Sequence, residues 1–129
     1  MKIKKLETFT KPFVSFVKTT LEDGSQGCGQ MSTYNADITA QIFHKQVAPW
    51  VLGKLWTDFN DLENLVLEKE HKFPGSYLLR AIAGLDTALW DLKGKLENKP
   101  VTTLIGGNSG SLKVYGSSMK RDISAYDEA

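Results

Sequence analysis

Two aspartates in the run AIAGLDTALWDLKGKLENKP, residues 81–100, are the first candidates for chemistry, because paired carboxylates can perform general acid–base catalysis. Asp86 and Asp91 lie in a segment whose apolar residues recur with helical spacing. At about 100° per residue, their separation places the two side chains roughly 140° apart around the helix axis. The spacing predicts that they do not act on one reacting atom. It favours a solvated acid at each position, with Asp91 paired to Lys95 one turn later.

The histidines and the cysteine do not form a catalytic or metal-binding pattern. His44 and His71 are the two histidines, and they are too far apart in the sequence for an HExxH-type zinc site. Cys28 is the single cysteine, which excludes an internal disulfide and a multi-cysteine metal site. We expect it to be a small buried side chain rather than a nucleophile. No catalytic or metal-binding residue is predicted in this chain.

Two glycine-rich stretches, GSQGCGQ and GGNSGS, lack the surroundings of a phosphate-binding loop. Such a loop joins a strand to the first turn of a helix, and neither stretch stands at such a junction. We therefore interpret both as turns.

Two polar stretches remain candidates for ligand binding. The stretch MSTYNAD, residues 31–37, follows a predicted strand, and Tyr34 and Asn35 are its candidate substrate-binding residues. The alternative is a polar connector that begins a helix. The stretch SSMKRD, residues 117–122, ends another predicted strand.

If that second strand belongs to a barrel, its carboxyl end lies on the active-site face. Ser118, Lys120 and Arg121 could then meet an anionic substrate. Taken alone, the stretch is an ordinary polar strand end.

The composition is that of one ordinary globular domain. The 129 residues are 41% hydrophobic and 24% charged, and 16 basic against 15 acidic residues give a net charge of +1. The charges are interspersed, so nothing indicates a nucleic-acid partner. No run approaches the ~18 apolar residues of a membrane span, and the N-terminus lacks the apolar core of a signal peptide. We expect a cytoplasmic protein without a membrane partner.

The order of the predicted elements is strands first and helices second, which is typical of an α+β fold. Residues 2–9 and 13–31 show strand-like patterns, and Lys11–Pro12 and Asp23–Gly24 interrupt them. A three-stranded antiparallel meander follows from this.

A helix is predicted next, capped by Asp37 or Thr39 and opened again or kinked at Pro49. Residues 57–70 show the spacing of a second helix, with acidic residues dense toward its start.

A long third helix carries an apolar stripe made of Leu78, Ile82, Leu85, Leu89, Leu92 and Leu96. Ala81, Gly84 and Ala88 form a strip of small residues beside it. Glycine in a helix interior costs up to ~1 kcal/mol relative to alanine, so Gly84 predicts that another backbone comes close there. Asn98 and Pro100 should end this helix.

The last residues have the pattern of a first strand and the start of a first helix of something longer. LKVYGSSMKRD is strand-like, and Ser124 with Asp127 approximates the start of a helix. So short a helix does not hold itself together in isolation, which favours a chain that is a piece of a larger protein.

The segment AIAGLDTALWDLKGKLENKPVTTLIGG, residues 81–107, closely resembles the helix signature of the mandelate racemase/muconate lactonising enzyme group of the enolase superfamily. The matching positions are Ala81, Ala83, Gly84, Leu85, Asp86, Ala88, Leu89, Asp91, Leu92, Gly94, Lys95, Pro100, Val101, Leu104, Ile105 and Gly106. The opening MKIKKLETF and the hairpin TTLEDGSQGCGQ also look like the amino-terminal domain of that family.

The resemblance implies an α+β capping domain in residues 1–110, a meander followed by a helical bundle, and the start of a truncated (β/α) barrel in residues 111–129. Enzymes of this family remove a proton α to a carboxylate, and Mg²⁺ stabilises the enolate. The metal ligands and bases lie on later barrel strands, so the resemblance assigns Mg²⁺ to the missing barrel and predicts that this segment alone is inactive.

The capping domain's expected contribution is substrate specificity, through the loop between its first two strands and the loop after its third. The first loop is short here, about Thr10 to Pro12, as in acid-sugar dehydratases, and polar residues at 32–37 suit a polyhydroxy acid. The resemblance also implies association with the chain's own barrel domain and a homo-oligomeric enzyme.

The leading hypothesis is therefore the amino-terminal part of a sugar-acid dehydratase, with a racemase or cycloisomerase of the same family as the alternative. A non-catalytic, stand-alone capping module that binds a partner is the hypothesis from another class.

Overall fold

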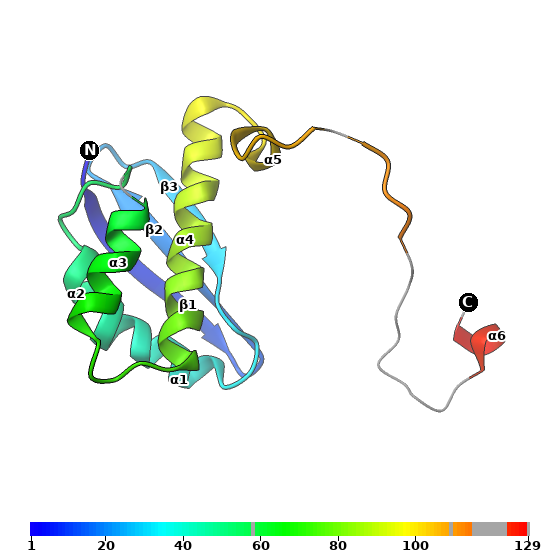
Figure 1. Cartoon of the computed structure of the whole chain (residues 1–129), viewed down its shortest axis with the longest axis horizontal. Coiled ribbons are helices and arrows are strands. Elements are labelled where there is room, and N and C mark those ends of the chain that lie inside the picture. The colour runs from blue at the N-terminus through cyan, green and yellow to red at the C-terminus, as the bar shows by residue number, and fades with distance from the viewer. Residues whose placement is uncertain (58, 109, 115–123, 129) are drawn as a thin grey trace.

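The strands form the predicted meander. A computed structural model describes residues 1–57, 59–108, 110–114 and 124–128. Ile3–Lys11 (β1), Val14–Leu21 (β2) and Gln26–Gln30 (β3) make an antiparallel sheet in the order β1-β2-β3. Figure 1 shows the sheet with the helices α1 to α4 gathered on one of its faces. The α+β class predicted from the sequence is confirmed.

The two hairpin turns are short. β1 and β2 are joined through Pro12 and Phe13, with Lys11 paired to Val14 across the turn. The second turn passes through Gly24, whose φ of 89° lies in the left-handed region that glycine adopts without strain.

The helices follow the three strands. They are α1 (Ala36–Ile42), the π-helical turn η1 (Phe43–Val47), α2 (Ala48–Val51), α3 (Phe59–Lys69), α4 (Ser76–Glu97), α5 (Val101–Leu104) and α6 (Ala125–Glu128). None of the helices in the described part of the chain is long and apolar enough to cross a membrane.

Pro49 causes the irregular path between α1 and α2. Proline has no backbone N–H, so the regular bonding of an α-helix cannot continue through it. The chain widens into η1, where the N–H of Ala48 donates to the carbonyl of Phe43 five residues earlier. This turn keeps Phe43 and Val47 fully buried. The predicted second helical piece at Pro49 is confirmed.

The apolar stripe of α4 forms the centre of the core. Leu78, Ile82, Leu85, Leu89 and Leu92 are buried, whereas Leu96, beyond the sheet, is 41% exposed. Val17 and Leu21 from β2, Phe43 and Val47 from η1, and Leu62 and Val66 from α3 pack in the same cluster. Asn98 then ends α4 in the left-handed conformation, with φ 50° and ψ 45°, as predicted.

β3 lies unusually close to α4. A Cβ on Gly29 would overlap the Gly84 carbonyl oxygen and lie 2.9 Å from the Cβ of Thr87. A Cβ on Gly27 would lie 2.7 Å from the Cβ of Leu92 and overlap the Ala88 carbonyl oxygen. Gly84 in turn makes room for the side chain of Met31. The backbone of β3 does come close to Gly84, at its carbonyl oxygen, but the space left by the missing Cβ of Gly84 is filled by the side chains of Met31 and Val17 and not by a backbone.

The same contact corrects two predictions. The stretch GSQGCGQ is a turn only at its beginning, and Gln26–Gln30 is strand β3. Alternate residues of a strand face opposite sides, so with Gly27 and Gly29 against α4, Cys28 points to the uncovered face of the sheet. Cys28 is exposed and not buried.

The predicted barrel start is only partly described. Residues 110–114 have no regular secondary structure, and the rest of the predicted strand lies outside the described residues. The helix start at Ser124 is confirmed, because its hydroxyl is bonded to the Asp127 carboxylate at 2.6 Å and accepts the Asp127 N–H at 3.2 Å. The division into residues 1–110 and 111–129 stays a prediction.

The packing of β3 on α4 predicts that Gly29→Ala destabilises the domain. The added methyl group would meet helix backbone, which cannot rotate away, so we expect a loss of at least about 2 kcal/mol in the free energy of unfolding. Urea denaturation of Gly29→Ala and of the unsubstituted chain measures this loss. Gly75→Ala is the matched control, since nothing lies within 4 Å of a Cβ there and its φ of 165° is extended. Equal urea midpoints for Gly29→Ala and the unsubstituted chain would contradict the packing.

Candidate functional site

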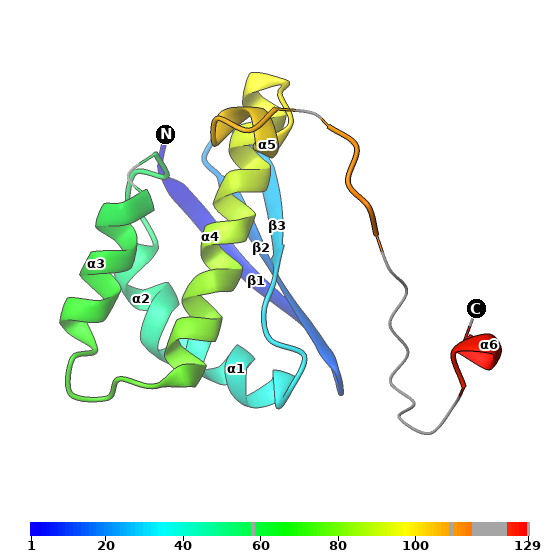
Figure 2. The same cartoon turned by 45° about the vertical axis from the view of Figure 1, so that its right-hand side comes forward.

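The two candidate specificity loops lie at the same end of the sheet. In a meander the first and third strands run in the same direction, so the β1–β2 turn and the loop after β3 leave the sheet together. Figure 2 shows both at the lower end of the domain, beside α1 and the start of α4. Gly27 packs near Leu92 and Gly29 near Gly84, so α4 runs antiparallel to β3. Its first turns therefore reach the loop of residues 31–35.

The loop ends at a left-handed residue. Asn35 has φ 49° and ψ 52°, a conformation that asparagine tolerates better than most residues. α1 begins at the next residue, and the Asn35 carbonyl accepts the Thr39 N–H at 3.0 Å and the Thr39 hydroxyl at 3.2 Å. The prediction that Asp37 or Thr39 caps this helix was wrong. Asn35 occupies the cap position, and its side chain makes no capping hydrogen bond.

Side chains of α4 hold the loop at two points. The Asn35 amide donates to the Tyr77 hydroxyl at 2.5 Å. The Arg80 guanidinium donates to the hydroxyl of Ser32. Sequence reasoning missed Tyr77 and Arg80, because their partners are 42 and 48 residues away and nothing in the local pattern marks the pairing.

Tyr34 stands between the two held residues. Its N–H donates to the Ser32 hydroxyl at 3.3 Å, while its side chain is 70% exposed. The structure thus brings Tyr34 and Asn35 into one group with Ser32, Tyr77 and Arg80. Hydroxyl, amide and guanidinium groups are the donors and acceptors that a hydroxylated carboxylic acid requires.

The other candidate binding residues, Ser118, Lys120 and Arg121, lie outside the described residues. Their proposed contact with an anionic substrate stays a prediction.

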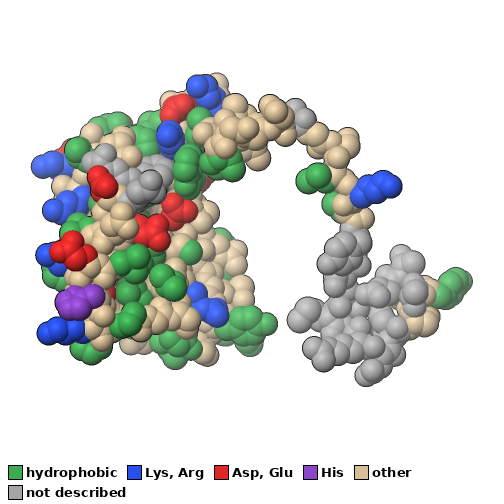
Figure 3. Space-filling view, viewed as in Figure 1, with side chains coloured by type: hydrophobic (Ala, Val, Ile, Leu, Met, Phe, Trp, Pro, Cys, Tyr) green, Lys and Arg blue, Asp and Glu red, His purple; other side chains and the backbone are tan. Residues whose placement is uncertain are grey.

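A metal-binding cluster is not present in the described part of the chain. Within residues 1–57, 59–108, 110–114 and 124–128, no three His, Cys, Asp or Glu side chains come together as metal ligands would. Mg²⁺ prefers several oxygen ligands in octahedral geometry, so these residues do not fit a magnesium site. Figure 3 shows acidic and basic side chains mixed over one face of the domain.

Asp91 binds the edge of the sheet. Its carboxylate accepts the N–H of Cys28 at 2.8 Å and pairs with Lys95 at 2.6 Å. The Lys95 ammonium also donates to the Gln26 carbonyl at 3.4 Å. The predicted Asp91–Lys95 pair is confirmed, and together its two members bond an N–H and a carbonyl on the free edge of β3.

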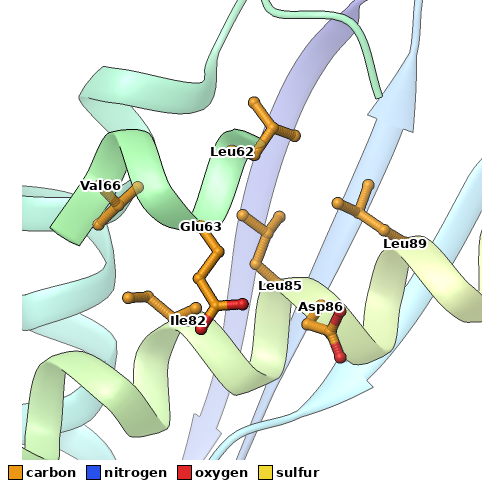
Figure 4. Close-up of a pocket in the computed structure, with 7 residues that line it drawn as sticks. All are labelled: Leu62, Glu63, Val66, Ile82, Leu85, Asp86 and Leu89. Carbon is orange, nitrogen blue, oxygen red and sulfur yellow. The ribbon is translucent and has the colours of Figure 1, made fainter. Parts of the chain in front are cut away.

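Asp86 faces a different neighbour. With Glu63 of α3 it lines a small apolar pocket between α3 and α4, whose other walls are Leu62, Val66, Ile82, Leu85 and Leu89 (Figure 4). Partial burial raises the pKa of Asp86 above its ordinary value of 3.8, and a hydrogen bond with Trp90 opposes this effect. Asp86 and Asp91 therefore lie in different environments, and they are not a catalytic pair.

Removal of the Asp91 carboxylate should open the edge of β3. For Asp91→Ala we expect a loss of about 1 kcal/mol in the free energy of unfolding, because a charge-assisted hydrogen bond at a half-exposed site is lost. Amide hydrogen exchange should become faster at Cys28. Glu97→Ala is the control, because it removes the exposed Glu97–Lys99 pair and should change stability by less than ~0.5 kcal/mol. Unchanged exchange at Cys28 would refute this role of Asp91.

Asp86→Asn tests the raised pKa while keeping the shape and an acceptor for Trp90. The native state binds the Asp86 proton more tightly than the unfolded chain does, so ionised Asp86 opposes folding at neutral pH. The variant should be more stable than the unsubstituted chain near pH 7. This advantage should shrink as the pH falls through the raised pKa and vanish below 3.8. Urea midpoints measured across this range report it, with Glu68→Gln as the control. A stability difference that does not vary with pH would contradict the raised pKa.

Comparison with known proteins gives a consistent result. The family model for the mandelate racemase/muconate lactonizing enzyme N-terminal domain matches residues 4–106. A D-galactonate dehydratase family member from Paenibacillus sp. (strain JDR-2) is 35% identical over 111 residues, which are 84% of this chain and 27% of that protein.

Solved structures agree with the fold. A protein from Roseobacter denitrificans, described as a proposed racemase, is 58% identical, has a TM-score of 0.90, and is matched over 99% of this chain and 35% of its own. A mandelate racemase/muconate lactonizing protein from Paracoccus denitrificans, complexed with magnesium, is 33% identical with a TM-score of 0.75, over 82% of this chain and 30% of its own. This chain thus spans about a third or less of the proteins it matches. The sheet and helices agree with the family-model match over residues 4–106. This match shows that the chain belongs to the mandelate racemase/muconate lactonizing enzyme N-terminal domain family of the enolase superfamily.

Proposed function

We propose that this chain is the substrate-specificity domain of a Mg²⁺-dependent enolase-superfamily enzyme that dehydrates an acid sugar. The observation that carries the proposal is the polar loop of residues 31–35, held at the end of the sheet in a chain of this family. The likeness to a D-galactonate dehydratase family member supports the substrate class.

In this proposal the chain binds and encloses the substrate and performs no chemistry itself. Tyr34 and Asn35 contact the hydroxyl groups of the acid sugar, and the short Pro12–Phe13 turn leaves room for its chain. Ser118, Lys120 and Arg121 contribute from the first barrel strand to binding the anion. Mg²⁺ and the base that removes the proton α to the carboxylate belong to the barrel in this proposal, which rests on the family relationship.

The proposal also includes three properties expected for such an enzyme: its own barrel as the covering partner of this domain, a homo-oligomeric assembly and a cytoplasmic location. These three are parts of the proposal and rest on the family relationship.

A racemase is the second candidate, because the Roseobacter denitrificans protein described as a proposed racemase is 58% identical to this chain. Both reactions begin with loss of the α-proton. A dehydratase then expels the neighbouring hydroxyl as water and yields a 2-keto-3-deoxy acid, whereas a racemase returns a proton to the opposite face.

Assay of the complete enzyme on a panel of acid sugars decides between them. We expect Mg²⁺-dependent formation of a keto acid, complete loss of activity with EDTA and recovery with excess Mg²⁺. The 129-residue chain alone should show no turnover. Changed optical rotation without keto acid, with deuterium from D₂O entering at the α-carbon, would establish the racemase instead. Turnover in EDTA, or by this chain alone, would refute both.

A further inference from the structure

The chain from β3 to α1 follows α4 residue by residue in the antiparallel direction. Gly27 packs at Leu92 and Ala88, Gly29 and Met31 at Gly84, Ser32 at Arg80, and Asn35 at Tyr77. The contact with α4 is therefore made by backbone packing along β3 and by side-chain hydrogen bonds beyond the end of β3. The last two contacts, Arg80 with Ser32 and Tyr77 with Asn35, are called the latch below.

The spacing of the latch is the same on both elements. Ser32 and Asn35 are three residues apart in the loop, and Tyr77 and Arg80 are three residues apart on α4. Residues at this spacing on a helix share one face, so a single face of α4 holds both ends of the loop.

The latch fixes a backbone that has few restraints of its own. Ser32 also binds within the loop, where its hydroxyl accepts the Tyr34 N–H, and Asn35 has a left-handed conformation that most residues avoid. Between these two fixed points the Tyr34 side chain is 70% exposed. The two anchors therefore restrain the backbone on either side of Tyr34.

Arg80 is available for this role. Within the described part of the chain, the Arg80 guanidinium donates to the Ser32 hydroxyl and forms no ion pair with a carboxylate. A guanidinium has five N–H donors in a rigid plane, so it can hold a hydroxyl in a defined direction.

We propose that Arg80 and Tyr77 are positioning residues: by holding Ser32 and Asn35, they fix the direction of Tyr34 and so determine how tightly the enzyme binds its acid substrate. They act through the loop and take no part in proton transfer. This inference rests on the proposed function, since it requires that the loop faces the substrate.

Three variants and a control test the latch. Arg80→Met removes the guanidinium and keeps an unbranched stem, Arg80→Lys keeps a cationic donor, and Tyr77→Phe removes only the hydroxyl. Lys72→Met removes one positive charge from an exposed turn away from the loop. All three positions, 72, 77 and 80, are at least partly exposed, so the fold should tolerate the changes.

The first measurement is amide hydrogen exchange in the 129-residue chain, which does not depend on any activity. Exchange of the Tyr34 and Thr39 amides, which donate to the Ser32 hydroxyl and the Asn35 carbonyl, should become roughly five- to tenfold faster in Arg80→Met and Tyr77→Phe, the factor expected for one lost hydrogen bond. Exchange in the middle of α4 should stay unchanged. Lys72→Met should match the unsubstituted chain. Unchanged loop exchange in both latch variants would overturn the proposal.

The second measurement separates binding from chemistry in the complete enzyme. KM for the acid sugar should rise by about the same factor in Arg80→Met and Tyr77→Phe, with kcat within about twofold, and Arg80→Lys should recover part of the loss. A looser loop with unchanged KM, or a loss confined to kcat, would overturn the positioning role. If the unsubstituted enzyme turns over no acid sugar, the proposed function fails and so does the substrate part of this inference. The exchange result still decides whether the latch holds the loop.

Discussion

The contact between the backbones of β3 and α4 is the constraint on which the rest of the domain depends. Neither Gly27 nor Gly29 can carry a side chain without displacing helix backbone, and Gly84 clears the space that Met31 needs. This approach fixes the register of the helix against the sheet. It places the apolar stripe of α4 over β2, where Val17 and Leu21 complete the core with the side chains of η1 and α3. The first turns of α4 reach the loop after β3 for the same reason.

The register of α4 against the sheet places its two aspartates in different environments. Five residues of helix separate a carboxylate that binds the sheet edge from one that lines an apolar pocket under α3. Asp91 and Lys95 bond to the open side of β3, and at the other edge of the sheet Ile3 exchanges hydrogen bonds with Gly53 and Lys54. Exposed strand edges invite pairing with other chains, so contacts at both edges protect the sheet. In the proposed enzyme, the part of this frame is to hold the loop of residues 31–35 toward the substrate.

Much of this frame could be predicted from periodicity. The alternation of apolar and polar residues and the Asp23–Gly24 turn predicted the meander, and the apolar stripe of α4 predicted the core. The open position of Cys28 could not be predicted, because a run of glycines in a strand has no apolar pattern to tell one face from the other. The cap at Asn35 was missed because its side chain bonds to Tyr77 rather than to the helix it begins. Tyr77 and Arg80 were missed for a similar reason: a hydrogen bond between distant segments leaves no local trace in the sequence.

The exposed position of Tyr34 has a consequence for how this domain can change over generations. Its side chain is neither part of the core nor one of the two held residues, so replacing it disturbs no packing and breaks neither anchor. If Tyr34 contacts the substrate as proposed, a replacement at this position can change the ligand at little risk to folding. The residues at 27, 29, 32, 35, 77 and 80 form the frame that such a replacement leaves in place.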